Sequence, residues 1–212
     1  MSLPPKPATR YSFALTLLIC SGLVAGLGAA APAPASNPPT ITDQKQLADS
    51  MEKKVVFIKE NGAKERPKRR TLVFSQDEIN AYFAERRVKM PEGVRSVTFD
   101  LTLDHVHAQA LIDFDDITRE RRSSNPLMYL FTGLHNVDVV AHTRGAGTGM
   151  VHVTVESVVI DGVTVPRMAL QFFVDHFVHP KYPNVGLDRD YRLPAKMDSV
   201  VIGQRKGTAT QK

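Results

Sequence analysis

The stretch VTFDLTLDHVHAQALI, residues 97–112, decides the fold class of this chain. Apolar and polar residues alternate along it on both sides of Asp104-His105, which is the period of a half-buried β-strand. If Asp104-His105 forms a two-residue turn, Leu103 opposes Val106 and all the apolar pairs fall on one face. The other expected pairs are Leu101 with Ala108, Phe99 with Ala110 and Val97 with Ile112. The pattern therefore predicts an antiparallel hairpin with one apolar face.

A second hairpin is expected farther along the chain. Its apolar face would pair Val139 with Val155, Ala141 with Val153 and Thr143 with Val151 across the glycine-rich loop at 145–149. The polar face would then place His142 opposite His152. A phase slip near Ser157 predicts a β-bulge or a point where both faces of the strand become buried. Asp161-Gly162 predicts a tight turn into residues 163–165.

Helices are expected before and after these hairpins. Leu47, Met51, Val55 and Ile58 make one apolar stripe on a helix over 43–59. A short strand over 71–74 leads into the capping box that begins at Ser75 and ends at Glu78, which predicts a helix over 76–87. Asn125-Pro126 predicts a short helix through Phe131, and residues 200–202 read as a closing strand.

The helix expected over 166–178 has apolar residues nearly all round it, which indicates burial on most sides by protein or by a ligand. Together these segments predict an α+β fold. A twisted antiparallel sheet of hairpins packs one face on the helices 43–59, 76–87 and 166–178, with a half-wrap of sheet around the apolar helix.

The N-terminal segment predicts export. Lys6 and Arg10 precede an uncharged apolar run over 11–28, and an Ala- and Pro-rich run ends at Ala35, which is the order of a secretory signal. The alternative is an uncleaved membrane anchor, because a bilayer-spanning helix needs about 20 residues. We expect a periplasmic or extracellular protein with a signal peptide over 1–35, an N-terminal helix and basic loop over 36–70, and an α+β domain over 71–212 that forms a single globular unit with helix 43–59.

Charge and cysteine usage narrow the chemistry of the expected mature chain. The 212 residues carry a formal net charge of +5, and the single cysteine, Cys20, lies in the expected signal peptide. Processing would therefore leave neither a disulfide nor a thiol nucleophile. The cations of the loop at 60–70 are expected either to face water or to contact anionic lipid head groups; they are Lys64, Arg66, Lys68, Arg69 and Arg70.

No catalytic signature accompanies the predicted fold. G-x-S-x-G, phosphate-binding and dinucleotide-binding motifs are absent from the sequence. All seven histidines lie between 105 and 179, so His142 and His152 are candidates for a metal site, but no H-E-x-x-H motif or cysteine pair supports them. No cofactor is predicted.

The order of elements resembles a group of uncharacterised exported bacterial proteins. The resemblance covers residues 71–211 and rests on the phrase LVFSQDEINAYF at 72–83, the antiparallel hairpins, the apolar helix entered through Val165-Pro166, and Leu193-Pro194 before the expected last strand. The arrangement also resembles tubular lipid-binding (TULIP-like) modules. In those modules a curved sheet enfolds a long helix, which implies an apolar groove.

These observations favour a non-enzymatic envelope protein that binds a lipid or another apolar ligand, with peripheral membrane contact and no nucleic-acid partner. The expected lining of the groove is Phe99, Leu101, Val139, Val153, Leu170, Phe173 and Phe177. Two alternatives stay open. One is a structural protein that docks on an envelope partner, and the other is a metal-dependent hydrolase that uses His142, His152 and a carboxylate such as Glu156.

Overall fold

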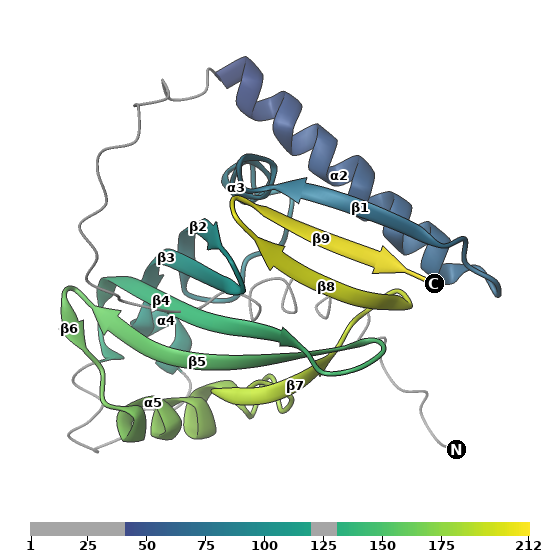
Figure 1. Cartoon of the computed structure of the whole chain (residues 1–212). Helices are drawn as coiled ribbons and strands as arrows, with labels where there is room; N and C mark the ends of the chain where they lie inside the picture. Colours follow the sequence, from purple (N-terminus) through teal and green to yellow (C-terminus); the bar gives the residue numbers. More distant parts are fainter. Residues whose placement is uncertain (1–40, 120–130) are drawn as a thin grey trace, which may run out of the picture.

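The computed structural model describes residues 41–119 and 131–212 (Figure 1). Its elements in chain order are α2 (Ile41–Ala63), β1 (Arg70–Ser75), α3 (Gln76–Ala84), β2 (Val94–Thr102), β3 (His105–Asp113), α4 (Phe114–Thr118), β4 (Leu134–Gly145), β5 (Met150–Ile160), β6 (Val163–Thr164), α5 (Arg167–Phe173), the π-helical turn η3 (Val174–Val178), β7 (Asp188–Arg192), β8 (Met197–Gly203) and β9 (Lys206–Gln211). Helices thus combine with antiparallel strands, so the predicted α+β fold class is confirmed.

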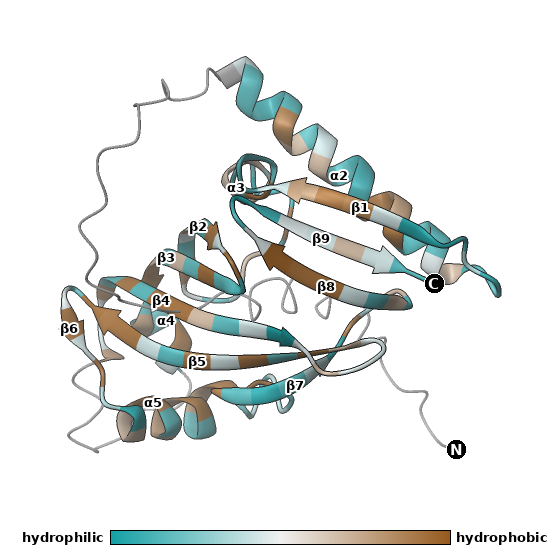
Figure 2. Cartoon of the chain, in the orientation of Figure 1, coloured by the Kyte–Doolittle hydropathy of each residue, from teal (hydrophilic) through white to brown (hydrophobic). Residues whose placement is uncertain are grey.

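The larger sheet has the order β2-β3-β4-β5-β6, and β7 pairs with β5 beyond the end of β6. Apolar and polar residues alternate along its central strands in Figure 2. Its first hairpin has the predicted faces in a different register, because Leu101 pairs with Val106 and Phe99 with Ala108. The turn is Leu103-Asp104, one residue earlier than predicted, and Asp104 has a φ of +59°, which Asp adopts more readily than most residues. Leu103 is consequently 69% exposed.

The second hairpin is also shifted from its predicted register. Ala141 pairs with Val155 and Thr143 with Val153, while the register slips between Val140 and Ala141. Because Val140 opposes Ser157, the slip leaves Glu156 as the extra residue of a bulge. The bulge predicted near Ser157 and the turn at Asp161-Gly162 are therefore confirmed.

A second, three-stranded sheet has the order β1-β9-β8 and was not expected from the sequence. Residues 200–202 lie in β8 as predicted, but β8 is followed by β9, which pairs with β1. The sequence of β9, KGTATQ, hides this strand because its inward-facing residues are Gly207, Ala209 and Gln211, which form no apolar alternation. The prediction of one sheet was wrong for this reason.

The helices lie near their predicted positions with different ends. Helix α2 extends the expected 43–59 at both ends, whereas α3 stops at Ala84, three residues before the expected end. The capping box of α3 is confirmed, since Ser75 Oγ accepts from the Glu78 amide at 3.1 Å and the Glu78 carboxylate accepts from the Ser75 amide at 2.9 Å. The helix predicted from Asn125-Pro126 through Phe131 lies outside the described residues except for its last residue. That residue, Phe131, is buried.

Two apolar clusters hold the described residues together. The first lies between α2, α3 and the three-stranded sheet on one side and β2 to β5 on the other; it includes Met51, Val55, Ile58, Phe74, Phe99, Leu101, Val106, Met197, Ile202 and Ala209. The second packs α5 and η3 against β4 and β5, and includes Phe114, Phe131, Val137, Ile160, Leu170 and Phe177. In Figure 1, β4 and β5 run between the three-stranded sheet above and α5 below.

Helix α5 is covered on one side only. Ala169 and Leu170 are buried, whereas Arg167 and Gln171 are exposed and Met168 is 74% exposed. The expectation that helix 166–178 is buried on most sides was therefore wrong. Its apolar residues outnumber those that the sheet can cover.

Candidate functional site

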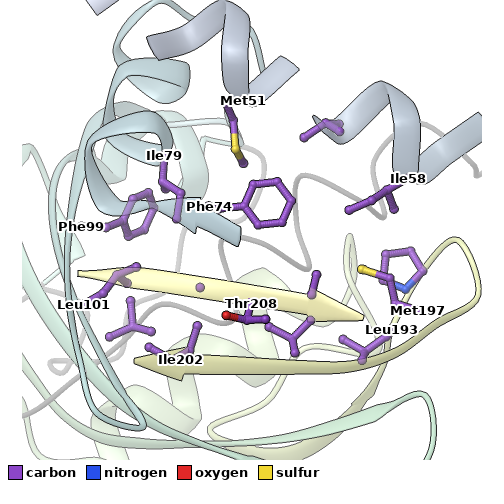
Figure 3. Close-up of a pocket in the computed structure, with 16 residues that line it drawn as sticks. Met51, Ile58, Phe74, Ile79, Phe99, Leu101, Leu193, Met197, Ile202 and Thr208 are labelled. Carbon is purple, nitrogen blue, oxygen red and sulfur yellow. The ribbon is translucent and has the colours of Figure 1, made fainter. Parts of the chain in front are cut away.

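A cavity of about 100 Å³ lies inside the first apolar cluster, between α2 and the two sheets (Figure 3). Its wall includes Met51, Val55 and Ile58 from α2, Phe74 from β1, Phe99 and Leu101 from β2, Leu193, Pro194 and Met197 from the chain around the start of β8, and Ile202, Gly207 and Ala209 from β8 and β9. The lining also includes Thr208, whose pairing partners Val73 and Val201 are exposed on the outer face of the three-stranded sheet, so its backbone and not its hydroxyl faces the cavity. Such a wall excludes water and holds hydrocarbon.

The space arises from a mismatch in side-chain size. The α2 stripe and the inner face of β2 present large side chains, whereas β9 presents Gly207 and Ala209 on the opposite wall. Phe74 and Ile202 flank Gly207 as its pairing partners on the neighbouring strands. A Cβ atom built on Gly207 would lie 3.7 Å from Ile202 Cδ1, an ordinary contact, so glycine is not forced here by crowding.

Two buried amides secure the end of the cavity near Ile58 and Pro194. Gln211 is 2% exposed, and its Nε2 donates to the carbonyls of Ile58 at 2.9 Å and Ala195 at 2.6 Å. Asn61 is 1% exposed; its Nδ2 donates to Gln211 Oε1 at 3.0 Å and to the Lys68 carbonyl at 2.8 Å. The two side chains join α2, β9 and the segment before β8, and their partners satisfy their buried polar atoms.

Glu78 holds α2 against α3 along the same helix. Its carboxylate accepts from Ser50 Oγ at 2.6 Å and from Lys54 Nζ at 2.6 and 2.7 Å. Burial raises the pKa of Glu78, but the hydrogen bonds from Lys54, Ser50 and the Ser75 amide outweigh it, so the net pKa lies below its ordinary value. The Lys54 ammonium also lies 5.6 Å from the centre of the Phe74 ring, which lines the cavity.

The predicted groove residues are divided between the two clusters. Phe99 and Leu101 line the cavity, and Val153 is buried elsewhere in the first cluster. Val139 packs against both clusters, whereas Leu170, Phe173 and Phe177 belong to the second cluster or pack against it. The apolar helix and the hairpins do not line one groove. The α2 stripe was visible in the sequence as a packing face, but its opposite wall was not, since β9 went unrecognised.

The cations predicted to contact anionic head groups lie together after α2. The side chains of Lys64, Arg66, Lys68, Arg69 and Arg70 are all exposed. Their segment is fixed to α2 and to the turn before β8, because the Lys68 amide donates to Asn61 at 3.0 Å and Lys196 Nζ donates to the Lys64 carbonyl at 2.6 Å.

The predicted pairing of His142 with His152 was wrong. His142 lies opposite Thr154 on one side and His105 on the other, and the rings of His105 and His142 have centroids 5.0 Å apart. His152 instead bonds Asp188 at 2.7 Å and Asp190 at 2.8 Å. The two-residue register shift separates the proposed ligands. Within 41–119 and 131–212, no group of three or more His, Cys, Asp or Glu side chains is arranged to hold a metal ion.

Comparisons of the chain with protein-family models, with curated proteins and with solved structures find no match. None of the helices in the described part of the chain is both long enough and apolar enough to span a membrane.

Proposed function

We propose that this chain is an exported, non-enzymatic protein of the cell envelope that binds a small apolar ligand or part of an acyl chain in the cavity beneath α2. The observation that carries the proposal is the cavity itself. It is lined by apolar side chains from α2 and both sheets. No carboxylate, imidazole or amine of the described residues lines it, so its wall favours binding over acid–base chemistry.

The volume sets the class of ligand. Dedicated pockets for drug-sized ligands measure about 300–1,000 Å³, and an apolar cavity of about 150 Å³ in another protein binds benzene. At about 100 Å³, this cavity has room for a short hydrocarbon segment, such as a section of one acyl chain.

Filling the cavity tests the proposal directly. Gly207→Val adds a β-branched side chain next to Ile202, where a Cβ fits at 3.7 Å. Since valine also favours strands, we expect the Tm to stay equal or rise, while affinity for the fluorescent fatty acid cis-parinaric acid falls by about tenfold or more. The matched control is Gly145→Val. A Cβ there meets nothing within 4 Å, and binding should remain at the wild-type level.

The natural occupant can be sought in protein purified from its own envelope. Native mass spectrometry followed by organic extraction should show a lipid or apolar molecule in the wild type and its loss in Gly207→Val. Equal occupancy in the two proteins, or equal binding of cis-parinaric acid, would place the ligand outside the cavity and refute the proposal.

A further inference from the structure

The positive charge of the chain is concentrated at one place in the structure. Residues 51–70 contain eight Lys and Arg and three Glu, a net charge of +5, which equals the net charge of the whole chain. The other residues therefore balance to zero. The segment comprises the second half of α2 and the exposed basic stretch that leads to β1.

Exposed apolar side chains lie within this charged region. Val56 is 42% exposed and Phe57 is 36% exposed, one turn from the exposed Lys53 and Glu60 on the outer side of α2. Val73 on β1 is 49% exposed. It lies beside the helix, because Lys54 Nζ donates to the Val73 carbonyl at 2.7 Å.

Exposed apolar side chains bordered by cations are typical of a surface that lies on an anionic bilayer. The apolar groups enter the boundary between head groups and acyl chains, and the cations meet lipid phosphates. A nucleic acid or an acidic protein loop would satisfy the cations but would leave Val56 and Phe57 in water. The combination therefore favours lipid.

We propose that the outer side of α2 and the basic segment form a docking face for an anionic lipid surface. The docking face comprises Lys53, Val56, Phe57, Lys64, Arg66 and Arg69. The inner side of the same helix, with Met51, Val55 and Ile58, is a wall of the cavity. Docking places that wall one helix diameter, about 10 Å, from the lipid surface. The docking proposal does not depend on the cavity being occupied.

Sedimentation with vesicles of phosphatidylcholine, with and without phosphatidylglycerol, tests the docking face. Each protein is expressed from the full-length gene, and intact mass confirms that all variants share one N-terminus. We expect the wild type to prefer vesicles that contain phosphatidylglycerol, and added salt to weaken its binding. Arg66→Glu/Arg69→Glu should lower the affinity by about tenfold or more. The control Arg192→Glu/Lys206→Glu makes the same charge change at exposed positions elsewhere and should bind as the wild type does.

A second pair of variants tests the apolar part of the docking face. Val56→Ser/Phe57→Ser should weaken vesicle binding several-fold, whereas Leu103→Ser/Met168→Ser, which changes the more exposed Leu103 and Met168, should not. Equal binding by the wild type to both vesicle types would overturn the proposal. So would equal loss in test and control variants, or binding to heparin without binding to vesicles.

The two proposals fail in different ways. Gly207→Val should still dock on phosphatidylglycerol vesicles, and Arg66→Glu/Arg69→Glu should still bind cis-parinaric acid. Loss of vesicle binding in Gly207→Val would contradict the independence of docking from the cavity.

Discussion

Gly62 shows how one residue fixes the position of α2. A Cβ atom at this position would lie 2.6 Å from the Ala195 carbonyl carbon and would collide with its oxygen. The neighbouring backbone therefore approaches the helix more closely than any side chain allows. Ala195 itself has a φ of +53° and accepts the Gln211 hydrogen bond, so the contact belongs to the buried amide network near the cavity.

We predict that Gly62→Ala destabilises the protein. In an ordinary helix this change adds stability by about 1 kcal/mol, but the clash with the Ala195 backbone should reverse the sign and cost about 1–3 kcal/mol. Urea unfolding measures the difference. The control is Gly203→Ala, where the new Cβ meets the Lys206 side chain at 3.7 Å, and it should change stability little. A gain of stability in Gly62→Ala would contradict the close approach.

A second residue-scale prediction concerns pH. His135 Nδ1 lies 2.5 Å from the Asp161 carboxylate. The hydrogen bond with Asp161 raises the pKa of His135 above 6.5, and the same hydrogen bond lowers the pKa of Asp161 below 3.8. The stability that His135 contributes is complete below the pKa of His135 in the unfolded chain, and it is lost as pH rises through the folded pKa. The stability that Asp161 contributes is lost as pH falls through the lowered folded pKa of Asp161.

Asp161→Asn should therefore cost more stability at about pH 5.5 than at about pH 8.5. Asparagine tolerates the φ of +47° at this turn and keeps an acceptor for the Asn136 amide. The measurement compares urea midpoints of the wild type and the variant. A gap between them that does not change with pH would show that the pair does not contribute through charge.

At the scale of elements, α2 is attached to α3 by a polar contact as well as an apolar one. Glu78 caps α3 through Ser75 and accepts from Ser50 and Lys54 of α2. Hydrogen bonds to a buried charge contribute about 1.5–3 kcal/mol. One carboxylate thus stabilises the start of α3 and one wall of the cavity.

Glu78→Gln should lower the free energy of unfolding by about 1–3 kcal/mol at neutral pH. Because the folded pKa of Glu78 lies below 4.5, its contribution is present above that value and is lost as pH falls. The variant and the wild type should therefore approach each other in acid. Hydrogen exchange should show faster opening of α2 in the variant, and Glu60→Gln, at an exposed position of α2, serves as the control.

The sequence predicted the elements that carry strong local signals. The Ser75–Glu78 capping box and the alternation in β2 and β3 depend on neighbours in the chain, so they could be read directly. Turn position was harder, because Leu103-Asp104 and Asp104-His105 both keep the same residues on one face. In the second hairpin a register shift of two residues likewise kept the apolar face but separated His142 from His152, and with them the candidate metal site.

The candidate site was only half predictable for a related reason. Phe99 and Leu101 lie on a strand with a clear pattern, and both line the cavity. The opposite wall depends on β9, whose small and polar residues carry no strand signal. That wall forms only through pairing with β1, more than a hundred residues earlier in the chain, and a local pattern cannot show such a contact.

On the scale of the whole molecule, the apolar cavity and the region of net positive charge lie at different places. The cavity lies inside the first apolar cluster, and the net positive charge lies on the outer side of one of its walls. Helix α2 belongs to both features. A lipid surface and an apolar ligand would consequently contact opposite sides of the same helix.

The pairing of β1 with β9 also fixes when the cavity comes into existence. Helix α2 and β1 are synthesised first among the described elements and β9 last. The cavity walls that α2 and β1 form are therefore made long before the wall that β9 forms. Contacts between such distant segments slow folding, since the loop between them must close first. During that interval the α2 stripe lacks the wall that β9 provides. A chaperone that shields apolar segments would have its clearest target there until the final strand joins the sheet.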